Sequence, residues 1–198
     1  MLVLRTLEFL IVDDEPLVQR ALAAVLRRYG TTKATPSARD AEEELDRNWD
    51  GLLIDVRLAA GSGLAVLASA RAKKIRAPAL VLSGWIDHET VNRCAALDAR
   101  LVSKPCGTPE LAPFLVEALF QKTNDRPFAA TERARHRWLL TDREVEILGF
   151  TLRGKSREQY LDTTGIAPNT YKTHVRALLE KADYSNLSTL AIDLLAES

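Results

Sequence analysis

Polar residues suited to phosphoryl chemistry follow four separate apolar segments of this 198-residue chain. They are Asp13 and Asp14 after residues 9–12, Asp55 after 52–54, Ser83 after 80–82, and Lys104 after 101–102. Three carboxylates in one place would repel one another unless a cation intervened, and Mg²⁺ prefers such hard oxygen ligands. A carboxylate can attack phosphorus, while a hydroxyl and an ammonium can hold phosphoryl oxygens. The set indicates a metal-assisted phosphoryl-transfer site.

Each of these residues stands where a short apolar run ends, and helix-length segments separate the runs. Such runs are typical of buried parallel strands, whose carboxyl ends line the crevice where these sheets bind ligands. The expected strands are 7–12, 31–35, 49–54, 79–82 and 99–102, and the expected helices are 16–29, 38–47, 63–73, 86–97 and 109–122. Right-handed crossovers place such helices on both faces of the sheet. We therefore expect an α/β domain with a doubly wound, five-stranded parallel sheet.

The same residues have plainer explanations when each is taken alone. The acidic segment 13–16 is a sound helix start, because acidic side chains offset the exposed amide dipoles and proline suits the first turn. For the acidic pair alone, capping explains the sequence as well as metal binding does. Asp55 could cap a turn, Ser83 could close one, and Lys104 could be a solvated loop cation. Their coincidence at the ends of four expected strands favours a common site.

Composition and charge restrict the class of protein further. The chain is 46% apolar and carries 27 basic and 27 acidic residues, so its overall charge favours no particular partner. Cys94 and Cys106 lack metal-ligand or redox spacing and are expected to be free thiols in a reducing compartment. The apolar start is too short to span a bilayer and no signal-peptide cleavage pattern follows it. We expect a cytoplasmic protein with no membrane partner.

The pattern changes after Lys122. Residues 123–127 carry helix breakers and no apolar period, whereas from Thr131 onward apolar residues recur at helical spacing. We therefore expect an α/β domain over 1–122, a linker over 123–137 and a small all-α domain over 138–198. Helix starts are expected at Thr141, which is followed by Glu144 at capping-box spacing, and at Ser156.

One expected helix of the second domain, 168–181, has two different faces. At 100° per residue its apolar residues cluster on one side. The residues nearly opposite are Asn169, Lys172, Thr173 and Arg176. With the preceding helix 156–163 and a short turn, this is a helix-turn-helix form whose second helix can enter a major groove. On pattern alone, an ordinary amphipathic helix is the simpler explanation.

Residues 1–122 resemble a response-regulator receiver domain, a flavodoxin-like fold whose pattern is an acidic pair, a phospho-acceptor aspartate, a Ser or Thr, and Lys-Pro at matching spacings. The resemblance implies that Asp55 is the phospho-acceptor and that Ser83 and Lys104 contact the phosphoryl group. The implied Mg²⁺ ligands are Asp14, Asp55 and the backbone carbonyl of Arg57, with Asp13 assisting through water.

Two departures from the receiver pattern bear on how phosphorylation would be read. Ala59 stands where the family usually has proline, which is expected to loosen the loop after Asp55. Leu101 stands where the family usually has a Tyr or Phe that swings inward on activation. Trp85, close to Ser83, either substitutes for that aromatic residue or packs under the following helix, and packing is the simpler expectation.

Residues 140–188 resemble a LuxR-type helix-turn-helix domain without gaps. The matching residues are Leu140-Thr141, Arg143-Glu144, Glu146, Leu148, Gly154, Lys155-Ser156, Ile166, Thr170, Lys172, His174, Lys181 and Asn186. By this resemblance Lys172, Thr173 and Arg176 face bases or nearby phosphates, and Asn169 and Thr170 lie near a phosphate at the positive helix start. Tyr160 and Tyr171 replace smaller family residues, which is expected to alter the docking angle. The last helix, 187–196, resembles the family's dimerisation helix and at minimum covers the core.

Together the two resemblances imply a two-component transcription factor of the NarL/FixJ type rather than an enzyme. Its implied partners are a histidine kinase, double-stranded DNA and a second copy of the chain when active, with RNA polymerase as a further candidate. The alternative is an atypical regulator whose DNA binding does not depend on phosphorylation. A carboxylate-nucleophile phosphatase is disfavoured, because the D-x-D arrangement on the first strand that such enzymes share is absent.

Overall fold

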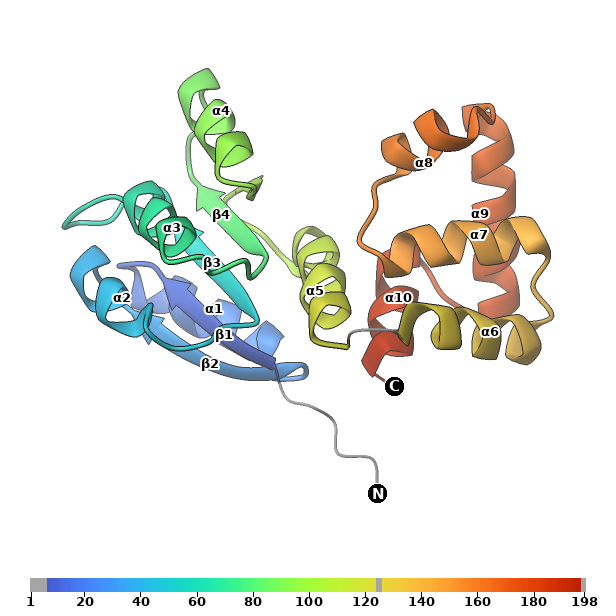
Figure 1. The fold of residues 1–198 in the computed structure, drawn as a ribbon, viewed down its shortest axis with the longest axis horizontal. Helices are drawn as coiled ribbons and strands as arrows, with labels where there is room; N and C mark the ends of the chain where they lie inside the picture. Colours follow the sequence, from blue (N-terminus) through green and yellow to red (C-terminus); the bar gives the residue numbers. More distant parts are fainter. Residues whose placement is uncertain (1–6, 124–125, 197–198) are drawn as a thin grey trace. The chain divides into compact units, whose positions relative to one another are not determined.

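The computed structural model describes residues 7–123 and 126–196 (Figure 1). They divide into two compact units, one ending at Phe114 and the other beginning at Leu115. None of the helices in these two described ranges is long and apolar enough to cross a membrane. The two units are treated separately below.

The first unit is a five-stranded parallel sheet with the strand order β2-β1-β3-β4-β5 (Figure 1). Its strands are β1 (Leu7–Val12), β2 (Gly30–Thr35), β3 (Gly51–Asp55), β4 (Ala79–Ser83) and β5 (Arg100–Ser103). The crossover helices are α1 (Pro16–Leu26), α2 (Ala38–Glu44), α3 (Gly63–Ala72) and α4 (His88–Ala96), and α5 (Thr108–Thr123) begins in this unit. The expected doubly wound sheet is confirmed, with helix ends shifted by a few residues.

Alternate residues of the strands are buried on opposite faces of the sheet, because successive side chains of a strand point in opposite directions. Leu10 and Leu52 belong to the core cluster that also contains residues of α2, α3 and α4. Phe9 lies on the other face, where its ring centroid is 6.0 Å from that of Phe114 in α5. Figure 1 shows α1 on the side of the sheet away from α2 and α3. A Cβ atom at Gly51 would lie 2.5 Å from the Phe114 ring, so α5 can approach the sheet only at a glycine.

The second unit is helical. It contains the end of α5 and the helices α6 (Arg126–Trp138), α7 (Asp142–Leu152), α8 (Arg157–Thr164), α9 (Pro168–Ala182) and α10 (Leu187–Ala196). A capping box starts α7 at Thr141, as the sequence predicts. A second capping box starts α8 at Ser156, where the sequence predicts a helix start. The apolar residues of α10 are buried against the neighbouring helices, so this helix covers the core.

Most of the segment expected to be an irregular linker is helical. Thr123 ends α5 and Arg126 begins α6, while residues 124 and 125 lie outside the described residues. Pro127 does not break α6, because an amide N–H in the first helical turn has no intrahelical partner to lose. Ala130 and Ala134 are fully buried, so α6 is packed and not merely a connector. The domain boundaries at 122 and 137 stay predictions.

An ion pair between a buried carboxylate and a partly exposed ammonium joins α7 to α9. Lys181 Nζ lies 2.7 Å from Glu144 Oε2, and the Thr141 backbone amide donates to the same oxygen at 2.8 Å. Only 4% of the Glu144 side chain is exposed, against 36% of the Lys181 side chain. Burial alone would raise the pKa of Glu144, but the hydrogen bonds from Lys181 and Thr141 outweigh it and lower this pKa. The charged form of Glu144 therefore stabilises the helical unit.

We expect Lys181→Met to destabilise the α7–α9 packing by about 1–3 kcal/mol at neutral pH, because a buried carboxylate loses its charged partner. Since the pKa of Glu144 is depressed by folding, its contribution is complete above the ordinary glutamate pKa of about 4.3 and is lost as the pH falls below it. Peptide-resolved hydrogen exchange, converted to opening free energies at each pH, measures both effects.

Lys172→Met is the matched control, because Lys172 is an exposed lysine of the same helix. The assignment would be contradicted if the two variants were equally stable, or if Lys181→Met kept the wild-type loss of stability at acidic pH.

Candidate functional site

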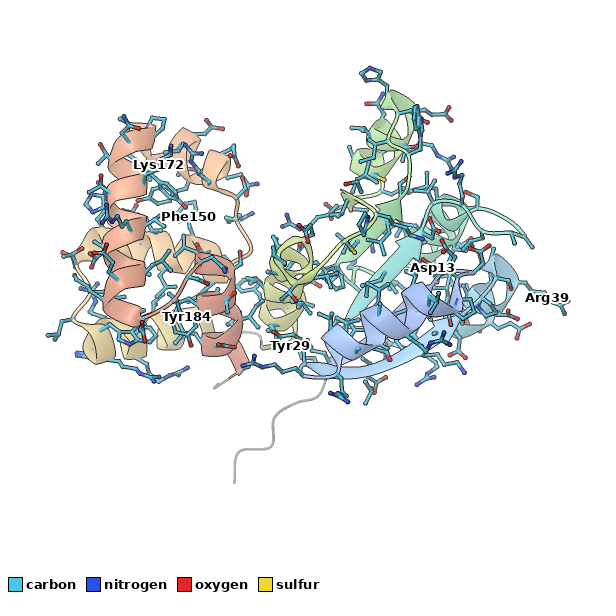
Figure 2. The ribbon with its side chains drawn as sticks, turned by 180° about the vertical axis from the view of Figure 1, so that it is seen from behind. Asp13, Tyr29, Arg39, Phe150, Lys172 and Tyr184 are labelled. Atoms are coloured by element: carbon cyan, nitrogen blue, oxygen red, sulfur yellow. The ribbon has the colours of Figure 1, made fainter. Side chains whose placement is uncertain are left out.

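Four neighbouring strands bring the phosphoryl-site residues to one edge of the sheet. β1, β3, β4 and β5 lie side by side in that order, and their register pairs Asp55 with Leu82 and Ser83 with Ser103. Asp13 follows directly after β1 and Lys104 directly after β5. Figure 2 shows Asp13 at the carboxyl end of β1. The strand ends therefore assemble the expected residues Asp13, Asp55, Ser83 and Lys104 at a common edge.

The Lys104 ammonium is the centre of this edge. Its Nζ atom donates to Asp13 Oδ2 at 2.8 Å and to Asp55 Oδ2 at 2.6 Å, and lies 3.6 Å from Glu15 Oε1. The side chains of Asp13 and Asp55 are 1% and 9% exposed, so both carboxylates are held in a largely water-free place. The Lys104 ammonium, which follows β5, thus connects Asp13, which follows β1, with Asp55, the last residue of β3.

The electrostatics of the edge leave negative charge in excess. Burial raises the pKa of Asp13, and the nearby Asp55 adds to this rise, although Lys104 and the Glu15 amide act in the opposite direction. Burial alone would lower the pKa of Lys104, but its hydrogen bonds to Asp13 and Asp55 outweigh it and raise this pKa. A single ammonium faces Asp13, Asp55 and Glu15, so the pocket favours a further cation.

Glu15 is an acidic residue of this edge that the sequence analysis did not single out. Carboxylate oxygens of Asp13, Glu15 and Asp55 all lie within 4.8 Å of one another, close enough to surround one hard cation. Glu15 is the N-cap residue of α1, yet its side chain makes no capping hydrogen bond. The run of three consecutive acidic residues could have signalled this, but as a helix start it had a sufficient explanation.

Asp14 points to the loop that follows Asp55. Its Oδ2 atom accepts a hydrogen bond of 2.8 Å from the backbone N–H of Ala59. A proline at position 59 could not donate this bond, because proline has no amide hydrogen. Ala59 therefore ties the loop to the acidic pocket, where the sequence analysis expected a loosening. The role of Asp14 as a direct metal ligand stays a prediction.

The loop after β3 is folded tightly around the acceptor candidate. The Arg57 backbone amide donates to Asp55 Oδ1 at 3.2 Å, and Arg57 and Ser62 form an isolated antiparallel bridge. At Gly63 an added Cβ atom would lie 1.8 Å from the backbone oxygen of Asp55, so only glycine allows α3 to start there. The loop therefore presents the Asp55 carboxylate from a backbone that has little freedom.

Ser83 is buried, and its hydroxyl is engaged by the loop before α4. The hydroxyl donates to the backbone carbonyl of Trp85 and accepts from the Trp85 amide at 3.1 Å. The Trp85 side chain is 70% exposed, so the expectation that it packs under α4 is wrong. Leu101 is half-buried and packs against the sheet core. The hydroxyl expected to read the phosphoryl group is thus coupled to an exposed aromatic residue.

The second candidate site is the turn between α8 and α9. α8 ends at Gly165, whose φ of 67° is the left-handed conformation that favours glycine. α9 begins at Pro168, a residue suited to a first helical turn. The inner face of α9 is held by Tyr171 and Leu178, which are buried. The structure therefore contains the helix-turn-helix form that the sequence predicts.

The opposite face of α9 is exposed and polar. All five residues expected to contact DNA are exposed: Asn169, Thr170, Lys172, Thr173 and Arg176. Figure 2 shows Lys172 on α9. The Arg176 guanidinium lies 2.8 Å from Glu180 Oε1, one turn further along, and both side chains are largely exposed. The face can offer cations to a phosphate backbone, with one of them restrained by a neighbouring carboxylate.

Bulky aromatic residues support this helix from inside. Tyr160 of α8 is fully buried, and its ring centroid lies 5.0 Å from that of Phe150 and 5.4 Å from that of Tyr171. Its hydroxyl donates to Glu146 Oε2 at 3.2 Å and accepts from Arg143 at 3.4 Å. The space where α7, α8 and α9 meet is therefore filled by edge-to-face and tilted aromatic contacts, and the Tyr160 hydroxyl among them is hydrogen-bonded. The effect of these residues on docking angle stays a prediction.

Comparisons with known proteins agree with both halves of this description. The family model described as "Response regulator receiver domain" matches residues 9–115. The chain is 24% identical to the nitrate/nitrite response regulator protein NarP of Escherichia coli over 88% of this chain and 87% of that protein. It is 25% identical to the transcriptional regulatory protein LiaR of Bacillus subtilis over 92% and 94% of the two chains.

Among solved structures, the chemotaxis protein CheY4 of Vibrio cholerae has the same fold. Its structure matches with a TM-score of 0.53 and 19% identity, over 57% of this chain and 98% of that chain. The family model covers more than half of the sequence, and both relatives extend the similarity through the helical unit. The expected resemblance is confirmed: this chain belongs to the response-regulator receiver-domain family.

Proposed function

We propose that this chain is a DNA-binding transcriptional regulator of a two-component system, in which Asp55 accepts a phosphoryl group from a histidine kinase. The observation that carries the proposal is the Asp55 carboxylate at the end of β3, whose Oδ2 atom lies 2.6 Å from the Lys104 ammonium. The same chain also has the exposed basic face of α9. Its relatives include proteins named as a response regulator and as a transcriptional regulatory protein.

The transfer step requires a carboxylate nucleophile and charge compensation. A carboxylate oxygen of Asp55 forms a bond to phosphorus while the bond between phosphorus and the kinase imidazole nitrogen breaks, and the electron pair stays on that nitrogen. The Lys104 ammonium already contacts Asp55, so it needs only a small shift to bind an oxygen of the phosphoryl group on that residue. The Ser83 hydroxyl, placed on the adjacent strand, holds a second oxygen.

The acidic set suits Mg²⁺. Carboxylate oxygens are hard donors, and those of Asp13, Glu15 and Asp55 lie within 4.8 Å of one another. Together these carboxylates carry more negative charge than the Lys104 ammonium neutralises. We expect Asp13, Asp14 and Asp55 with the Arg57 backbone carbonyl to hold the ion, with Glu15 near it. When bound, Mg²⁺ supplies charge neutralisation for the transferred phosphoryl group.

The output is DNA binding by α9. We expect Lys172, Thr173 and Arg176 to face the major groove, and Asn169 and Thr170 to lie near a phosphate at the start of the helix. An active homodimer would read two half-sites about one helical turn apart. RNA polymerase is a further candidate partner of that dimer.

Phosphorylation of Asp55 is the first test. Incubated with acetyl phosphate and Mg²⁺, the wild type should gain one phosphoryl group by intact mass, and its affinity for a selected DNA duplex should rise about fivefold or more. Asp55→Ala should show neither change, whereas Asp46→Ala, an exposed aspartate paired with Lys73, should behave as wild type.

Absence of the phosphoryl group on the wild type would overturn the proposal. Phosphorylation of Asp55 without any change of DNA affinity would instead favour a regulator that binds DNA constitutively, the alternative suggested by Leu101.

The DNA face is tested by charge. We expect Lys172→Ala and Arg176→Ala each to weaken binding and to reduce the slope of log affinity against log salt by about one, because each removes one phosphate-facing cation. Fluorescence anisotropy over a salt series measures both quantities. Glu180→Gln should act in the opposite direction by freeing Arg176.

Arg133→Ala, which removes an exposed arginine of α6, is the control and should leave the salt slope unchanged. If it weakened binding as much as Arg176→Ala, the contact face would not be α9.

The Ala59 tether is tested by restoring the family's usual proline. Ala59→Pro removes the N–H that binds Asp14, so we expect Mg²⁺ to bind roughly two- to tenfold more tightly, in line with the net worth of one hydrogen bond. Isothermal titration calorimetry with Mg²⁺ alone measures the affinity. Ala59→Ser keeps the amide hydrogen and should match the wild type. A folded Ala59→Pro protein with unchanged or weaker Mg²⁺ binding would show that the tether does not restrain Asp14.

A further inference from the structure

The first half of the loop between β4 and α4 is bound to the Ser83 hydroxyl. The hydrogen bonds described for the Trp85 main chain are its two bonds with the Ser83 hydroxyl. The side chains of Trp85 and Ile86 are 70% and 45% exposed, so packing anchors neither of them. An added Cβ atom at Gly84, between Ser83 and Trp85, would meet nothing within 4 Å, so no neighbouring group packs against the chain at this point. The position of Trp85 therefore depends on where the Ser83 hydroxyl points.

Ser83 itself is fixed by its backbone and free only in its side chain. Its carbonyl accepts from the Lys104 amide at 2.8 Å, which keeps the residue in the sheet ladder beside β5. Its neighbour Leu82 lies opposite Asp55 in the register of β3 and β4. A rotation of the Ser83 side chain can thus redirect the hydroxyl without moving the strand.

A hydroxyl has one hydrogen to donate. In the structure that hydrogen is donated to the Trp85 carbonyl. A phosphoryl oxygen on Asp55 would be the stronger acceptor, because hydrogen bonds to charged groups exceed those between neutral groups. The hydroxyl can donate to one of the two acceptors at a time, so a Ser83 hydroxyl turned to a phosphoryl oxygen would release the Trp85 carbonyl.

We infer that Trp85 is the residue through which this receiver reads its phosphorylation state, in the place that Leu101 leaves without an aromatic ring. Ser83 is a two-position donor, and Trp85 is the positioning residue that holds it in the resting state. The inference rests on the proposed function, because it requires a phosphoryl group on Asp55.

The release reaches α4 directly. Asp87, two residues after Trp85, caps this helix by accepting from the Thr90 amide at 2.7 Å. Only Thr90 and Cys94 of α4 are buried, so the helix is lightly attached to the rest of its unit. Displacement of Trp85 therefore changes both an exposed aromatic surface and the start of an adjacent helix.

The indole resonances of the full chain test this inference. The protein has three tryptophans, and Trp85→Phe assigns the resonance of interest in a proton–nitrogen correlation spectrum. Addition of Mg²⁺ and beryllofluoride, a phosphoryl mimic, should shift the Trp85 indole more than those of Trp49 and Trp138. Trp49 is an internal reference, because it precedes β3 at the end of the strand opposite to Asp55. Its indole N–H donates to the Glu44 carbonyl at 2.9 Å.

Variants of Ser83 identify the link. Ser83→Thr keeps the hydroxyl and should keep the Trp85 shift. Ser83→Ala removes a contact to the phosphoryl mimic and should bind it more weakly, so it is measured at a beryllofluoride concentration at which the fluorine resonance shows full occupancy, where it should lose the Trp85 shift. Trp85→Ala should reduce the phosphorylation-dependent gain in DNA affinity to less than half of the wild-type gain, with phosphorylation of Asp55 intact.

The outcomes separate the inference from the proposed function. If beryllofluoride binds but the Trp85 resonance stays in place, or shifts equally in Ser83→Ala, the inference fails and the proposed function stands. If beryllofluoride does not bind to the wild type, or still binds to Asp55→Ala, the proposed function fails and the inference fails with it.

Discussion

The arrangement of the first unit depends on one ammonium group shared by carboxylates that follow different strands. Two buried carboxylates cannot both stay ionised side by side without a cation, and Lys104 supplies it from the end of β5. The backbone amide of the same lysine fixes Ser83 in the ladder. Lys104 thus makes direct contacts with residues at the ends of β1, β3 and β4. A group bound to Asp55 must change the contact between Asp55 and Lys104. The change alters the surroundings of the other residues that Lys104 contacts.

Much of this was predictable because strand ends are visible in sequence. Wholly apolar runs locate the buried strands, and a parallel sheet leaves little choice about where the residues after them meet. The capping boxes of α7 and α8 were equally predictable, since they rest on residues close in sequence. The least predictable features depend on long-range contacts. The hydrogen bond from Ala59 to Asp14 joins residues 45 positions apart and uses a backbone amide, which no side-chain pattern reveals.

Other differences have physical causes of their own. Trp85 looked like a packing residue because aromatic side chains are mostly buried, but exposure of a single large apolar residue breaks no rule of folding. Glu15 was hidden by a helix start that already explained it. The proline of α6 looked like a breaker, although its place in the first turn makes it compatible with the helix. In each case the residue type was informative and its neighbours in space decided the outcome.

The aromatic crossing of α8 and α9 has a consequence for how regulators of this kind can diversify. Phe150, Tyr160 and Tyr171 pack together on the buried side of α9. None of the residues expected to contact DNA takes part in that packing. Within α9, packing and the proposed DNA contact therefore fall to different side chains. Substitutions on the exposed face can change the proposed contacts without opening the aromatic core.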